Sequence, residues 1–136
     1  MPSAVGPVVP ALLCPGTVIF IWLFPFFRHR GIVSDRYCGD KPMVISNSAR
    51  AGGVIEEPWD AFAAGQSVQV EGYPSRLAPW IVVQRARDCV GTRYSLVNWN
   101  CDHLVSDAHG LVTRSPQVAL VIAVALIAGL FVMTAD

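Results

Sequence analysis

One cysteine in this sequence lies where a catalytic thiol could form. Cys101 follows a strand-like run and begins a stretch with helix-like periodicity. A helix N-terminus concentrates partial positive charge and free backbone N–H groups, which favour the thiolate form of a nearby cysteine. The thiolate attacks carbonyl carbon, so Cys101 is the candidate nucleophile. The alternative is that Cys101 is a small buried core residue, which is the usual place of a free cysteine.

A nucleophilic cysteine needs a general base, and the candidate is His29. It lies within residues 27–34, a segment with the composition of a β-strand. Alternation along that strand places Arg28 and Arg30 on the face opposite His29. A histidine on a strand that faces a cysteine at a helix start is the arrangement of a papain-like site. The alternative is a structural or exposed histidine.

A third group should hold the imidazole of His29 in the right tautomer. The candidates are Ser46 and Asn47, at the end of a short predicted strand. The amide of Asn47 is the better orienting group, because the hydroxyl of Ser46 would act weakly. The sequence therefore predicts a catalytic set of Cys101, His29 and Asn47 that converges in space.

The composition limits the classes of function. The chain has 136 residues, no formal net charge and 53% hydrophobic residues, and its mean hydropathy is +0.46. A nucleic-acid-binding protein would show a basic excess, so direct binding of nucleic acid is not expected. The scattered arginines belong to a solvated surface: Arg76, Arg85, Arg87 and Arg93. Four cysteines without a C-x-x-C pair favour reduced thiols, and we expect no metal and no cofactor.

The hydrophobic patterns predict an α+β domain with a curved antiparallel sheet and packed helices. Strands are expected at 17–24, 27–34, 43–47, near 54, and at 67–72. A short helix is expected with Pro58 in its first turn, and two further helices are expected at 79–91 and 101–110. Residues 35–42 read as a hairpin loop. In the helix at 79–91, Trp80 and Val90 are expected on one face with Val83 and Arg87.

The end of the chain is apolar. Residues 118–134 contain seventeen residues without a charge, which is at the short end of the range that spans a bilayer. We therefore divide the chain into a globular domain, 1–114, and a C-terminal hydrophobic tail, 115–136, that is expected to be a membrane segment. The alternative is a buried core helix. Residues 4–27 are also apolar, but prolines interrupt them and no basic residue precedes them, so a secreted protein is not expected.

Two segments carry a resemblance to a known family. Residues 29–33 (HRGIV) and 100–105 (NCDHLV) resemble the H-box and NC motif of the lecithin:retinol acyltransferase-like family, and residues 15–19 (PGTVI) resemble its opening turn and strand. The resemblance covers residues 14–110 and implies a permuted papain-like fold related to NlpC-type peptidases. The second histidine of cellular members would fall on Lys41, so this sequence lacks it.

Within that family, the short length and apolar tail resemble the H-box/NC form of picornavirus 2A proteins, particularly the kobuvirus type. This resemblance implies a non-structural protein without protease activity that supports viral RNA replication and encapsidation. It also implies the host cytoplasm and replication membranes as the location. The expected partners are host membranes, through the tail, together with other viral replication proteins and host factors.

Two other functions compete with this interpretation. One is a Cys-His acyltransferase or phospholipase that acts on lipid esters at membranes. Cys101 would attack the ester, His29 would transfer the proton, and backbone N–H groups at the helix start would stabilise the oxyanion. The other is a binding module in which a cleft or the tail recruits host or viral proteins.

Overall fold

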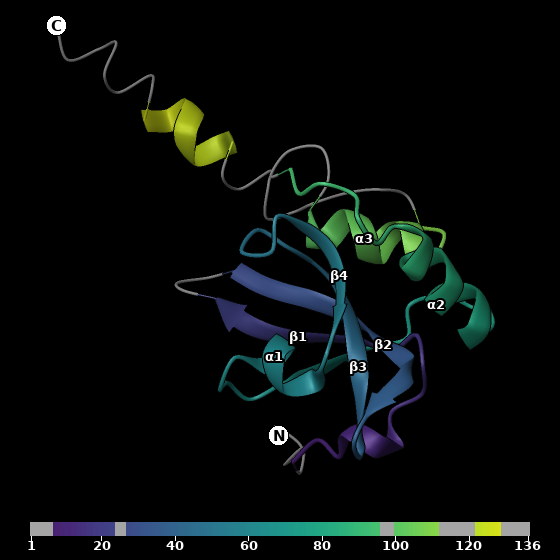
Figure 1. Ribbon diagram of the computed structural model, residues 1–136. Coiled ribbons are helices and arrows are strands. Elements are labelled where there is room, and N and C mark those ends of the chain that lie inside the picture. The colour runs from purple at the N-terminus through teal and green to yellow at the C-terminus, as the bar shows by residue number, and fades with distance from the viewer. Residues whose placement is uncertain (1–6, 24–26, 96–99, 112–121, 129–136) are drawn as a thin grey trace, which may run out of the picture.

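The computed structural model describes residues 7–23, 27–95, 100–111 and 122–128. Figure 1 shows an open sheet with helices on both of its faces, which confirms the predicted α+β class. The sheet is antiparallel, with the strand order β4-β3-β2-β1-β5. The strands are β1 (Val18–Leu23), β2 (Phe27–Cys38), β3 (Lys41–Ser48), β4 (Gly53–Glu57) and β5 (Gln69–Gly72). The helices are η1 (Pro10–Leu12), α1 (Trp59–Ala63), α2 (Pro79–Asp88) and α3 (Cys101–Ala108).

The connection between β2 and β3 is shorter than the sequence predicts. The expected loop at 35–42 is largely strand, because β2 continues to Cys38 and β3 begins at Lys41. Gly39 takes the positive φ of 66° that this tight turn requires. The register of β2 against β3 shifts between Val33 and Tyr37, so β2 is irregular there, before the turn at Gly39.

The two faces of the sheet are covered by different helices. Alternate residues of β1 and β2 divide between them, so Val18 and Ile32 pack on one face while Ile19 and Val33 pack on the other. The first face is closed by α2 and α3, with a core of Val18, Ile32, Ile45, Val54, Val82, Val83, Ala86, Leu104, Val105 and Ala108. The second face is closed by α1, with a core of Ile19, Ile21, Val33, Val44, Trp59 and Phe62.

Helix α2 buries a different face from the predicted one. Val82, Val83 and Ala86 are buried, whereas Trp80 is 71% exposed and Val90 is also exposed. Of the residues expected on one face of this helix, Val83 is therefore buried, whereas Trp80 and Val90 are exposed. Ala86 packs with Val82 and Val83 in the same buried cluster as Ile32 and Ile45 of the sheet, so this side of the helix faces the core.

The structure describes little of the C-terminal tail. Residues 122–128 form a helix whose side chains are exposed, and most of the expected membrane segment at 118–134 lies outside the described residues. Within the described part of the chain, no helix is both long enough and apolar enough to cross a bilayer. The division into 1–114 and 115–136 stays a prediction.

Candidate functional site

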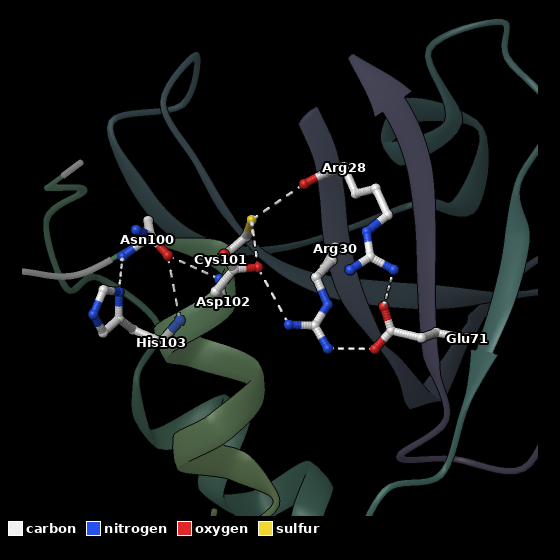
Figure 2. Close-up of polar contacts among 7 residues, drawn as sticks. All are labelled: Arg28, Arg30, Glu71, Asn100, Cys101, Asp102 and His103. Carbon is white, nitrogen blue, oxygen red and sulfur yellow. Dashed lines mark hydrogen bonds and ion pairs between the residues drawn. The ribbon is translucent and has the colours of Figure 1, made fainter. Parts of the chain in front are cut away.

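The start of α3 is fixed by a capping box. Asn100 precedes the helix, and its Oδ1 accepts hydrogen bonds from the backbone N–H groups of Asp102 (2.9 Å) and His103 (3.3 Å). His103 returns the contact, because its Nδ1 accepts from the backbone N–H of Asn100 at 3.2 Å. Figure 2 shows this reciprocal pair beside the cysteine. The Asn-Cys-Asp-His run thus sets the position at which the helix begins, and Cys101 is its first residue.

The thiol of Cys101 is buried against the middle strand of the sheet. Its Sγ lies 3.6 Å from the carbonyl oxygen of Arg28 and 4.0 Å from Oδ1 of Asp102. The side chain is only 8% exposed. Burial, followed by the nearby carboxylate of Asp102, raises the pKa of the Cys101 thiol to about 11. The expected ease of ionisation is therefore not found, because the effect of burial on this pKa exceeds that of the backbone N–H groups of Arg30 and Asp102, which lower it.

Charged side chains on the same face of β2 connect that strand to α3. Arg30 donates to Asp102 Oδ1 at 3.2 Å and also to Glu71 of β5. Arg28 donates to the second oxygen of Glu71 at 3.0 Å, and these links are drawn in Figure 2. Since Asp102 is 2% exposed, its carboxylate is a buried charge that the guanidinium of Arg30 compensates. The network therefore fixes the N-terminus of α3 against the sheet.

His29 lies on the opposite face of β2. Its imidazole stacks on the ring of Phe62 in α1, with 5.1 Å between the ring centroids. Burial, and then the positive charge of Arg50, lowers the pKa of His29 to about 4. The imidazole lines a cleft of about 170 Å³ whose walls are largely apolar. The cleft is lined by Ile21, Leu23, His29, Ser48, Ala49, Arg50, Phe62 and Ala64.

The structure does not bring the imidazole of His29 to the thiol of Cys101. Strand alternation places His29 opposite Arg28 and Arg30, as expected, but it is Arg30 that meets α3, through Asp102, whereas the sequence predicts that His29 faces that helix. Gly31 reinforces this orientation, because a Cβ there would lie 2.5 Å from Cγ1 of Val44 and 2.9 Å from Phe62. The bare backbone lets Phe62 approach β2 and stack on the imidazole.

The two candidate orienting residues also lie on different faces. Asn47 pairs with Val54 in the register of β3 and β4, so it lies on the face that α2 and α3 cover. Ser46 pairs with Gly31 and shares the face of His29. Both side chains are buried, and Ser46 Oγ has no hydrogen-bond partner among the described residues. The assignment of Cys101, His29 and Asn47 as a catalytic set stays a prediction.

Sequence reasoning missed the residues that support this region. The acidic partners Asp102 and Glu71 carry a weak signal, since opposite charges on facing elements are common on solvated surfaces. His109 was missed as well. Its ring lies 2.6 Å from Oγ of Ser75 and 2.8 Å from the carbonyl oxygen of Gly16, so it links the end of α3 to the first turn of the domain. Burial lowers the pKa of His109.

The site offers no set of metal ligands. Across residues 7–23, 27–95, 100–111 and 122–128, no three His, Cys, Asp or Glu side chains are grouped as a metal ion would require. The four cysteines are free thiols. The described residues thus present a neutral thiol on one face of the sheet and a neutral imidazole on the other.

Comparison with known proteins places these elements in one family. The sequence model described as lecithin retinol acyltransferase matches residues 26–110, which includes His29, Cys101 and all of β2 to α3. No curated protein matches the sequence. The matched region contains most of the sheet and both helices that cover its cysteine-bearing face.

Proposed function

The chain belongs to the lecithin retinol acyltransferase family, and from this premise we propose that it is a non-enzymatic accessory protein of picornavirus replication. It is of the H-box/NC type of 2A protein, similar to the kobuvirus type. In this proposal it supports viral RNA replication and encapsidation and has no protease activity. The family itself suggests an acyltransferase-like or phospholipase-like activity. In this proposal the present member does not have that activity.

The observation that carries the proposal is the separation of His29 from Cys101 by the backbone of β2. A general base has to come within hydrogen-bond reach of the proton that it removes. Here the imidazole stacks on Phe62 on the far face, while the thiol meets the carbonyl oxygen of Arg28. With a pKa of about 11, Cys101 holds its proton at neutral pH. Family membership thus supplies the fold, and the H-box and NC residues have roles in folding.

The proposed location is the host cytoplasm at replication membranes. The tail at 115–136 would attach the domain to host membranes, since its residues are apolar and its described helix exposes Ile122, Val124, Leu126 and Ile127. The proposed partners are other viral replication proteins and host factors. Direct contact with nucleic acid is not part of the proposal, because the chain has no net charge.

The test compares replication with folding in the same variants. Cys101→Ala and His29→Ala are introduced into a replicon of the virus that encodes the chain, and each purified variant is melted. We expect viral RNA accumulation to fall only as far as the melting temperature falls. Cys38→Ala is the matched control, since Cys38 is an exposed thiol outside the site. A Cys101→Ala variant that melts like wild type and yet abolishes replication would contradict a non-enzymatic role.

A second function, thiol acyl transfer or phospholipid hydrolysis, has one observation in its favour. Cys101 is the first residue of α3, where the partial positive charge of the helix N-terminus could stabilise an oxyanion. The measurement is acyl transfer from labelled phosphatidylcholine to the full chain, followed by mass spectrometry of the cysteine-containing peptides. An acyl group found on Cys101 in wild type and in Cys38→Ala, with no labelling of Cys101→Ala, would establish this second function. The same result would contradict the proposed non-enzymatic role.

A further inference from the structure

The pairing of β1 with β2 extends beyond the pairs that either strand forms with its other neighbour. Within the described residues, β5 pairs with β1 as far as Phe20, and β3 pairs with β2 from Gly31 onward. Beyond these points, residues 21–23 and 27–30 pair with each other alone. We call these residues the β1–β2 ribbon. At about 3.4 Å per residue, its end lies roughly 10 Å past the last residue of β1 that β5 flanks.

The end of the ribbon is apolar on both faces. Trp22 is 48% exposed and Leu23 is 44% exposed, and as neighbours in a strand they point to opposite faces. The rings of Trp22 and Phe20 are in edge-to-face contact, while Leu23 lines the cleft beside His29. A protein groove covers one face of a strand. The boundary region of a lipid bilayer, in contrast, surrounds an inserted strand end and contacts both of its faces.

Guanidinium groups lie behind this apolar end on each face. Arg28 pairs with Trp22 across the ribbon and lies over the ring of Phe20, 5.3 Å from its centroid. On the other face, Arg50 lines the same cleft as Leu23 and is 69% exposed. Each arginine is paired with a carboxylate of the domain, Glu71 or Glu57. The guanidinium of Arg50 has five donors and is largely exposed, so it can also donate to lipid phosphate oxygens.

We propose that the β1–β2 ribbon inserts its end, with Trp22 and Leu23, into the interface of a phospholipid bilayer. In this position the two guanidinium groups lie at the level of the phosphates. Tryptophan favours this boundary, because its ring is apolar and its N–H group is polar. The depth of roughly 10 Å matches that of apolar side chains that enter the boundary between head groups and acyl chains. The contact is independent of the tail and of any chemistry at Cys101.

The first experiment uses the full chain and reports on Trp22 itself. Tryptophan fluorescence is measured with vesicles of phosphatidylcholine that carries bromine on its acyl chains, which quench nearby indole rings. We expect wild type to be quenched and Trp22→Phe to lose that quenched component. Trp80→Phe is the matched control, because Trp80 is exposed on α2 and away from the ribbon, and it should keep the component. Equal quenching of wild type and Trp22→Phe would overturn the proposal.

The second experiment changes the ribbon and keeps Trp22 as the reporter. In the Trp80→Phe background, Leu23→Asp should lower the equilibrium constant for insertion, read from bromine quenching of Trp22, roughly tenfold, because a carboxylate opposes entry of the ribbon. Leu12→Asp is the control, since Leu12 is exposed on η1, and it should leave quenching unchanged. Unchanged quenching in Leu23→Asp would contradict insertion. A concentration-dependent change in Trp22 emission without vesicles would also overturn it, in favour of ribbon pairing between two copies.

Discussion

The buried position of His29 makes the stability of the domain depend on pH. Burial and Arg50 lower the pKa of His29 from 6.5 to about 4 in the folded protein. The unfolded chain therefore binds a proton at this site between pH 6.5 and 4 that the folded chain does not bind. The contribution of His29 to stability is complete above pH 6.5, decreases as the pH falls, and levels off below 4. At pH 5 the two values correspond to a loss of about 2 kcal/mol.

The assay is urea unfolding of wild type and His29→Gln at pH 7.5 and pH 5. Glutamine does not titrate, so we expect the variant to lose about 2 kcal/mol less between the two pH values than wild type loses. His109 also has a lowered pKa through burial and adds to the slope of both proteins, so it cancels in the difference.

The control for this assay is His103→Gln. Glutamine at this position can still close the capping box, and the variant leaves His29 in place. It should therefore keep the part of the slope that comes from His29. If His29→Gln shows the same pH dependence as wild type, the imidazole titrates normally, and its stacked position on Phe62 is wrong.

Three further predictions test the packing around the site. Asn100→Ala should lower stability by about 1 kcal/mol because α3 loses its cap, and Asn100→Asp should keep most of it in the same urea assay. Gly31→Ala should cost roughly 1–3 kcal/mol, since its Cβ would lie 2.5 Å from Val44 Cγ1, and thermal melting measures the loss. At pH 8, iodoacetamide should modify exposed Cys38 at least about a hundredfold faster than Cys101, whose pKa is about 11, and equal rates by mass spectrometry would contradict the buried thiol.

The sequence predicts the elements of this fold well where a pattern is local. Alternation and β-branched residues locate the strands, and the Asn-Cys-Asp-His run marks the start of α3 within a residue. The end of β2 was missed because the tight turn at Gly39 follows polar residues that also suit a loop. The buried side of α2 was not identified, because the expected face followed Trp80 and Val90, whereas the structure buries Val82, Val83 and Ala86.

The candidate site shows where local patterns stop being informative. Alternation gives the correct relation between His29 and its neighbours Arg28 and Arg30. It does not say which of the two faces α3 covers, because that depends on contacts between residues some seventy positions apart. The structure places the arginine face against α3, where Arg30 pairs with Asp102. The face of β2 that α3 covers therefore decides whether Cys101 lies near His29 or near Arg28 and Arg30.

The residues of the two motifs have folding roles that do not require catalysis. Asn100 caps α3, Asp102 pairs with Arg30, and His29 stacks on Phe62, whereas the thiol of Cys101 makes only long contacts. A fold that retains these motifs for structure should depend more on Asn100 and Asp102 than on Cys101. An enzyme would show the reverse order, since its thiol is indispensable and its cap is replaceable at a modest cost. The order of these effects therefore distinguishes an inherited fold from a retained activity more directly than the presence of the motifs does.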